Sequence, residues 1–218
     1  FLHLEMGIPG LPPARVGVDA EKAALDAGVA SIYPNMMGTP DLKAQAARFI
    51  KAFLDVNEDM NVRLAALDDP DQGLPDEVLE STDVLIWWGH MSHHLVADEL
   101  VEKIRQRVYL GKMGFVALHS AHHSKPFRAI LGTTGNLTWG RNQREVMWNL
   151  LPTHPIAEGI PDHFDLELEE LYAEPFYIPD PDDLIFGAWY ESGHIFRAGA
   201  TFTRGLGKIF YFQPGHET

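Results

Sequence analysis

The 218-residue sequence contains no cysteine. Without a thiol, the chain can form no disulfide, can offer no thiolate to a metal and can use no cysteine nucleophile. Basic residues are also scarce, since 17 Lys and Arg stand against 31 Asp and Glu, for a formal net charge of -14. A chain this acidic repels a phosphate backbone, which argues against nucleic acid as a partner.

Long apolar runs are missing as well. No stretch approaches the ~20 apolar residues that a membrane-spanning helix needs, and we expect a soluble, cytoplasmic protein without a membrane partner. The length favours one domain over residues 1–218. Because the chain starts at Phe1 without a methionine and stops at Thr218 just after a polar motif, we expect it to be truncated at both ends.

Apolar runs alternate with amphipathic segments along the first half of the chain. Residues 5–40 are expected to be mainly a loop, with one short helix near Asp19 to Ala27. Further helices are predicted at 39–53, 75–80 and 98–109, and strands at 62–67, 84–88 and 115–118. This β-α-β-α-β order predicts a parallel sheet with helices on both faces and with 84–88 buried on both sides. Shorter segments at 164–168, 184–189, 195–198 and 208–212 are predicted as later strands, some of them antiparallel.

Three histidines follow predicted strands. His90 comes shortly after 84–88, His119 directly follows 115–118, and His216 follows 208–212 after three residues. Ligands of open α/β sheets bind beyond the carboxyl ends of the strands, so we expect these imidazoles to share one cleft. Imidazoles can bind a metal, shuttle protons or hydrogen-bond a ligand, and no compact metal motif decides between these roles.

The remaining histidines and the carboxylates are less informative. Solvent exposure is the favoured interpretation for His93, His94, His122 and His123, and a surface position for His154, His163 and His194. Glu217 lies beside His216. In the acidic stretch before Pro175, Glu167 and Glu169 are expected to be solvated, whereas Glu170 and Glu174 remain candidates for the site.

The stretch from Asn136 to Arg141 places an amide, the Trp139 ring and a guanidinium on an expected loop. Such a group suits stacking on a sugar face with hydrogen bonds to hydroxyls. A core tryptophan beside a surface arginine is an equally good interpretation.

Several motifs in order resemble the ThuA-like trehalose utilisation family. They are Asp83 to His90, Ala117 to His122, Thr201 to Gly205, and Gln213 to Glu217. Phe1 to Glu5 is similar to the end of the family's first strand and Ile32 to Asn35 to the following loop, while residues 6–30 look like an insertion. The resemblance implies an α/β, flavodoxin-like or class I glutamine amidotransferase-like fold: a three-layer sandwich with a mainly parallel central sheet and extra antiparallel strands.

The resemblance also bears on chemistry. His119 occupies the strand-to-helix elbow where amidotransferases carry the nucleophilic cysteine, so glutamine hydrolysis by that route is excluded. Ser120 is a weak nucleophile candidate because no Ser-His-Asp order surrounds it. The family implies a link to catabolism of trehalose and related disaccharides through 3-keto intermediates.

Two hypotheses follow. The first is a hydrolase, lyase or isomerase acting on a small-molecule sugar or keto-sugar, with no nucleotide cofactor. Its expected catalytic residues are His119, His90, His216 and Glu217. The same three histidines are the expected ligands of a divalent metal, zinc first, and substrate contacts are expected from Trp139, Asn136, Arg141, Glu170 and Ser120. The second hypothesis is a non-catalytic carbohydrate-binding or regulatory module. A homo-oligomer is compatible with either.

Overall fold

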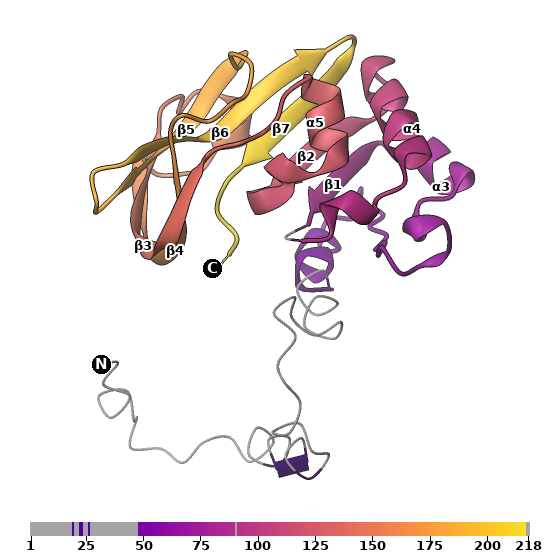
Figure 1. Ribbon diagram of the computed structural model, residues 1–218, viewed down its shortest axis with the longest axis horizontal. Helices are drawn as coiled ribbons and strands as arrows, with labels where there is room; N and C mark the ends of the chain where they lie inside the picture. The colour runs from indigo at the N-terminus through magenta and orange to yellow at the C-terminus, as the bar shows by residue number, and fades with distance from the viewer. Residues whose placement is uncertain (1–18, 20–21, 24–25, 27–47, 90, 217–218) are drawn as a thin grey trace. The chain divides into compact units, whose positions relative to one another are not determined.

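The computed structural model describes residues 19, 22–23, 26, 48–89 and 91–216 of the chain (Figure 1). The chain divides into two units, residues 1–64 and residues 65–218. In the first unit, the described residues of the helix expected near Asp19 are helical, and residues 48–54 form the last part of the helix expected from residue 39. The strand and loop expected before residue 36 lie outside the described residues.

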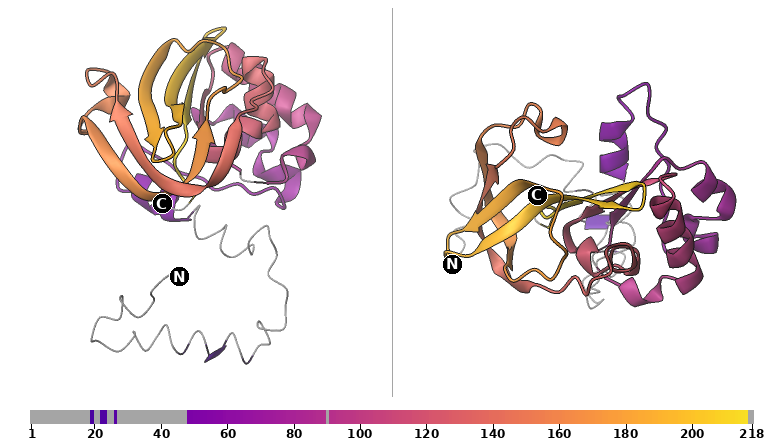
Figure 2. Two further views of the ribbon diagram at one scale, coloured as in Figure 1. Left: turned by 60° about the vertical axis from the view of Figure 1, so that its left-hand side comes forward. Right: turned by 90° about the horizontal axis from the view of Figure 1, so that it is seen from above.

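A seven-stranded sheet with the order β1-β2-β7-β6-β5-β3-β4 forms the second unit. The strands are β1 Val84–Trp88, β2 Gly114–Leu118, β3 Thr138–Asn149, β4 His163–Ala173, β5 Asp183–Tyr190, β6 Ile195–Arg204 and β7 Gly207–Phe212. β1, β2 and β7 run parallel, and the other four pairings are antiparallel. The sheet is therefore mixed and curls through its antiparallel half (Figure 2).

The expectation of a mainly parallel sheet is wrong for the described strands. Two of the six pairings are parallel, because the later strands are joined directly to one another rather than through crossover helices. β3 also begins at Thr138, so most of the stretch from Asn136 to Arg141 belongs to a strand and not to a loop.

Helices pack on the parallel half of the sheet. They are α3 Asp76–Glu80, α4 Asp98–Tyr109 and α5 Lys125–Leu131, with short 3-10 turns η3 Pro70–Gly73, η4 His93–Leu95, η5 His119–His123 and η6 Pro155–Ala157. α4 buries Leu100, Ile104 and Val108, which recur every four residues on one face. Among the described helices, none combines the length and apolar character required to cross a lipid bilayer.

Two details of the first predicted strands are wrong. Residues 61–66 have no strand assignment and are mostly exposed, so the strand expected at 62–67 does not form. β1 does form, but alternate residues on one face are open: Val84, Ile86 and Trp88 are 55%, 40% and 36% exposed. Trp87, on the opposite face, packs against the core.

The core lies between the helices and the sheet and continues under the antiparallel strands. Phe127 of α5 contacts Tyr211 of β7, and Tyr211 packs in turn against Phe176 and Phe196. All four side chains are buried. This aromatic cluster joins α5 to both halves of the sheet, and His122, in the turn after β2, packs against two of its rings.

Candidate functional site

The chain makes an abrupt turn at the carboxyl end of β2. His119, the first residue after β2, has a φ of 51°, and the turn η5 leads from it into α5. A left-handed backbone is uncommon outside glycine and costs conformational free energy, and such residues concentrate at functional sites. The elbow presents a histidine at the carboxyl edge of the parallel strands.

A backbone hydrogen bond sets the protonation of the His119 ring. Nδ1 lies 3.0 Å from the carbonyl oxygen of Gln213, and the side chain is fully buried. A carbonyl only accepts hydrogen bonds, so Nδ1 must carry a proton. In the neutral ring, Nε2 is then the nitrogen that carries the lone pair.

Nε2 of His119 points at two oxygen atoms from β4. One is Glu170 Oε2 at 3.3 Å and the other is the Tyr172 hydroxyl at 3.4 Å, and the Tyr172 ring stacks on the imidazole with centroids 5.1 Å apart. The tyrosine can donate to Nε2 when that nitrogen carries no proton. A carboxylate, however, is stable opposite Nε2 only if a proton or a cation lies between them.

His216 completes the group. Its ring centroid lies 5.3 Å from that of His119, and one ligand atom from each of His119, Glu170 and His216 lies within 4.8 Å of the other two. Tetrahedral zinc ligands at ~2.1 Å from the ion are about 3.4 Å from one another. The three side chains are therefore the right types to hold a divalent ion, but they would have to close inward to do so.

A buried carboxylate fixes the segment that carries His216. Glu169 accepts hydrogen bonds from the backbone N–H groups of Gly215 at 3.2 Å and His216 at 3.1 Å, and it is fully buried. The expectation that Glu169 is solvated is therefore wrong, whereas Glu167 is exposed as expected. Glu169 is buried because the segment after β7 passes over β4 and needs an acceptor for its backbone.

The neighbours of Glu170 favour its charged form. Burial by itself raises the pKa of Glu170, but hydrogen bonding to His119, the charges of His119 and His216, and the Tyr172 hydroxyl together lower that pKa below its ordinary value. Burial, and then the charge of Glu170, raise the pKa of Tyr172. Tyr172 therefore keeps its proton at neutral pH and is a hydrogen-bond donor.

Glu145 of β3 is a second fully buried carboxyl group, close to Glu169. Burial and the charge of Glu169 raise the pKa of Glu145 to about 8. The Gln213 side-chain amide faces it, and in the orientation that satisfies both groups its nitrogen donates to Glu145 Oε1 at 2.7 Å. Because the Gln213 carbonyl also accepts from His119, one residue links the buried acid to the elbow.

Two of the expected site residues, His90 and Glu217, lie outside the described residues. Ser120 is buried next to the elbow, and its hydroxyl donates to the Gly89 carbonyl at 3.2 Å. Trp139 is 69% exposed and pairs with Tyr172 across β3 and β4. Directly paired residues project from the same face of a sheet, so this indole lies beside the His119 group.

Asn136 and Arg141, the other two expected substrate contacts of the stretch from Asn136 to Arg141, are exposed on either side of Trp139. Burial and the charge of Arg128 lower the pKa of His123, close to the elbow, and the Asn136 side chain opposes that shift. Arg141 is exposed within β3. Asn136 therefore has a described link to the elbow region, whereas Arg141 extends the same surface along β3.

The expectation that His122 is exposed to solvent is wrong. His122 is 2% exposed, and its Nδ1 lies 2.6 Å from the Gly135 carbonyl. Burial and the adjacent His123 lower the pKa of His122 to about 3, so the ring stays neutral inside the protein. His123 and His93 are half-buried, whereas His94 is exposed as expected. The bond to the Gly135 carbonyl shows that His122 braces the loop before β3.

Sequence reasoning overlooked Tyr172, Gln213 and the buried position of Glu169. Gln213 directly follows β7, so the same strand-end rule that selected the histidines could have found it. Tyr172 and Glu169 carried no such signal. Their roles depend on how β4 pairs with β3 and on where the segment after β7 runs.

Comparison with known proteins extends this picture. The fold resembles a protein from Bacteroides uniformis described as ThuA-like, with a TM-score of 0.55 and 17% identity over 78% of this chain and 75% of that chain. It also resembles a protein from Parabacteroides merdae described as ThuA-like, with a TM-score of 0.51 and 18% identity over 62% of this chain. The match spans 60% of the length of the Parabacteroides protein. No protein with a curated description matches the chain.

These likenesses concern the fold alone. The ThuA family model, described as trehalose utilisation, matches residues 32–218, which is most of the chain. The protein therefore belongs to the ThuA, or trehalose utilisation, family.

Proposed function

We propose that the protein is an enzyme acting on a sugar or keto-sugar at the group formed by His119, Glu170 and His216. Family membership supports a role in sugar metabolism. The observation that carries the proposal is the buried His119 ring, whose Nδ1 is tied to Gln213 while Nε2 points at a carboxylate 3.3 Å away. A histidine oriented on one side and paired with an acid on the other is suited to general acid and base work.

The chemistry assigned to these side chains is proton transfer. The proton held between Nε2 of His119 and the charged Glu170 is donated to a substrate oxygen. Once it has left, Nε2 takes a proton from a substrate hydroxyl, or from the carbon next to a keto group, and Glu170 stabilises the imidazolium that forms. Tyr172, which keeps its proton, donates a hydrogen bond to the oxygen on which negative charge develops. These steps suit a hydrolase, a lyase or an isomerase.

In place of the proton between Nε2 of His119 and Glu170, the same side chains are the proposed holders of a divalent metal, with zinc first. His119, Glu170 and His216 supply two imidazoles and a carboxylate, which are ordinary zinc donors, and His90 is a further proposed ligand. A bound metal would polarise a carbonyl or a water molecule. No nucleotide cofactor is proposed.

Substrate contacts are assigned to the surface beside the elbow. Trp139 offers an exposed ring face next to Tyr172, and Asn136 and Arg141 offer exposed polar groups for hydroxyls. Ser120, which is buried beside the elbow, is kept as a proposed contact there. Glu217, next to His216 in the sequence, is kept as an assisting acid. The sugar partner is thus bound between β3 and the segment that follows β7.

We further propose that the protein has the three-layer, class I glutamine amidotransferase-like fold. In the class I glutamine amidotransferase-like arrangement, helices cover both faces of the parallel strands. The open apolar side chains Val84, Ile86 and Trp88 on one face of β1 support a further layer there, because such a face is stabilised by being covered.

Turnover of keto-sugars tests the function. The purified protein is incubated with 3-keto-trehalose and related keto-disaccharides, and substrate loss is followed by chromatography. The informative variant is His119→Asn, because asparagine tolerates the left-handed backbone at this position but cannot act as a base. We expect its kcat/KM to fall at least 100-fold, whereas His194→Asn, at an exposed turn, stays at the wild-type rate.

Binding of these sugars without turnover would instead indicate a non-catalytic module. Metal content measured on the purified protein, and activity before and after chelation, test the metal separately. Full activity in a metal-free sample would remove the metal from the proposal and leave the acid–base group in place. Ammonia release from glutamine is not expected, because the chain has no cysteine.

A further inference from the structure

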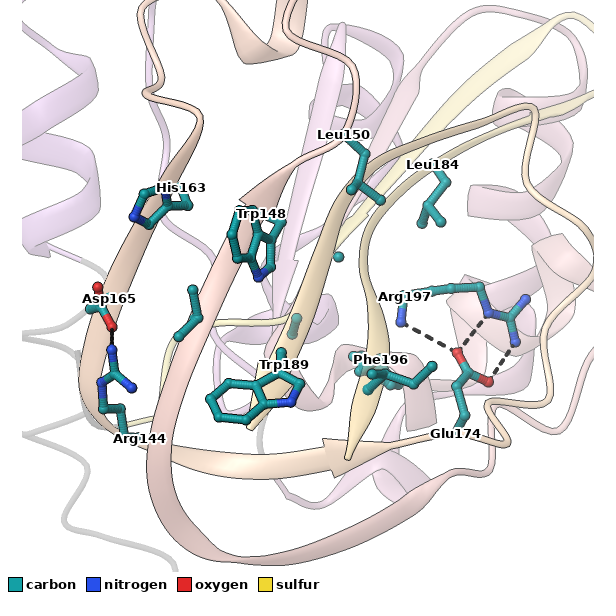
Figure 3. Close-up of a pocket in the computed structure, with 14 residues that line it drawn as sticks. Arg144, Trp148, Leu150, His163, Asp165, Glu174, Leu184, Trp189, Phe196 and Arg197 are labelled. Atoms are coloured by element: carbon teal, nitrogen blue, oxygen red, sulfur yellow. Dashed lines mark hydrogen bonds and ion pairs between the residues drawn. The ribbon is translucent and has the colours of Figure 1, made fainter. Parts of the chain in front are cut away.

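A second feature lies on the antiparallel half of the sheet, where a hollow of about 780 Å³ is lined by residues of β3, β4, β5 and β6 (Figure 3). In the strand register, Trp148 of β3 pairs with Gly187 of β5, and Val146 pairs with Trp189. Paired residues project from the same face, so both tryptophans lie on the face that forms the hollow. None of the residues of the His119 group lines it.

The two indole rings of Trp148 and Trp189 are partly open to solvent. Trp148 is 46% exposed and Trp189 is 37% exposed, whereas Met147 and Ala188, which project from the opposite face, are buried. Diagonal neighbours on adjacent strands lie roughly 7–8 Å apart. Gly187 has no side chain, and the Leu150 side chain, which also lines the hollow, packs over it.

Ion pairs flank the two rings. Arg144 of β3 pairs with Asp165 of β4 on one side, and on the other side Arg197 of β6 donates to Glu174 through Nε at 2.7 Å and Nη2 at 3.0 Å (Figure 3). Nη1 of Arg197 takes no part in these two bonds. The charges of the acidic and basic residues that line the hollow cancel, although the chain as a whole carries a formal net charge of -14.

We infer that this hollow is a second binding site, for a neutral saccharide of two or more rings. Indole faces suit the apolar faces of sugar rings, and guanidinium and carboxylate groups fixed at both sides suit hydroxyls. The balanced charge favours a neutral ligand over a sugar phosphate or a sugar acid. The volume falls within the range of roughly 300–1,000 Å³ seen for small-molecule sites.

A protein surface is a poorer occupant. Pressing a second copy of the chain into the hollow would take two ion pairs out of water, at a cost that such pairs seldom recover. A saccharide leaves water at the rim and can bond to the groups that the ion pairs do not use. The inference goes beyond the proposed enzyme and does not depend on it, because the residues are different.

The test is calorimetric titration of the purified protein with trehalose, sucrose, maltose and maltotetraose. We expect at least one of them to bind, and Trp148→Ala and Trp189→Ala each to weaken that binding at least tenfold. Phe53→Ala, which removes a 70% exposed ring from the helix at residues 48–54, is the matched control and should bind like the wild type. His119→Asn should also retain this binding, which separates the hollow from the proposed catalytic group.

A second measurement avoids dependence on the stability of the alanine variants. Trp148→Phe and Trp189→Phe assign the two indole N–H resonances in the NMR spectrum of the wild type, and we expect these two to shift first as saccharide is added. Binding that both alanine variants retain, or shifts confined to other tryptophans, would overturn the inference. Tighter binding of glucose 6-phosphate than of the neutral saccharides would also overturn it. So would a wild-type protein that binds no saccharide but forms a dimer that the substitution Trp148→Ala dissociates.

Discussion

Glu169 is the residue on which the position of His216 depends. Its carboxylate holds two backbone N–H groups inside the protein, and hydrogen bonds to a buried charge contribute about 1.5–3 kcal/mol each. Glu169→Gln keeps the shape but loses the charge, and we expect the free energy of unfolding to fall by about 2 kcal/mol in urea titrations.

Glu167→Gln is the matched control for that variant. Glu167 lies two residues earlier on β4 and is exposed, so its variant should stay within about 0.5 kcal/mol of the wild type. Equal stability of the two variants would contradict the role given to Glu169.

Glu145 makes stability depend on pH. Its pKa in the folded protein is about 8, whereas an exposed glutamate titrates near 4.5. Between these values the folded chain holds a proton that the unfolded chain has released, so stability falls as pH rises, by up to about 1.4 kcal/mol per pH unit. Glu145→Gln removes this dependence of stability on pH, and we expect the variant to lose less stability than the wild type between pH 5 and pH 8.

Urea titrations of both proteins at several pH values measure that difference. His122 titrates in the opposite sense, because its depressed pKa costs stability as pH falls below about 6.5. Its contribution is the same in both proteins and cancels in the comparison. Parallel curves for the two proteins would show that Glu145 is already ionised in the fold.

At the scale of elements, the N-terminus of α5 is stabilised by a capping residue, Ser124. Ser124 is buried, and its hydroxyl accepts a hydrogen bond from the Phe127 N–H at 3.3 Å. Loss of such a cap costs about 1 kcal/mol, so Ser124→Ala should lower the melting temperature by about 2–4 °C. Ser192→Ala, at an exposed turn, should leave it unchanged, and an equal effect of both variants would rule out the cap.

Elements with a regular pattern were predictable from the sequence. α4 begins and ends where its apolar spacing predicts, since Leu100, Ile104 and Val108 mark one face. β3 was missed because its first half is polar and because its register with β4 shifts twice, around Gln143. Each shift breaks the alternation by which a strand is recognised. The strand expected at 62–67 has a suitable composition, but it pairs with no strand among the described residues.

The candidate site was predictable only where a residue follows a strand directly. His119 leaves β2 without a gap, so its place at the edge of the sheet could be read from the chain. Tyr172 and Glu169 lie within β4, and their orientation depends on the β3 partner and on the segment after β7. These contacts are tertiary, and no local pattern carries them.

At the scale of the whole molecule, the proposed catalytic group is assembled from three distant parts of the chain. His119 follows β2, Glu170 lies in β4, and His216 follows β7. Unfolding of residues 65–218 separates all three. An unfolded chain therefore offers no competing site for a ligand that needs them together.

Thermal stability can consequently serve as an assay for a ligand whose reaction is unknown. A molecule present at 100 times its dissociation constant adds about 2.7 kcal/mol to the folded state, which corresponds to a rise of roughly 5–10 °C in melting temperature. Keto-sugars and divalent metal ions can be screened in this way, with His119→Asn as the reference protein. A compound that raises the melting temperature of the wild type but not of His119→Asn would be the first to use for crystals and kinetics.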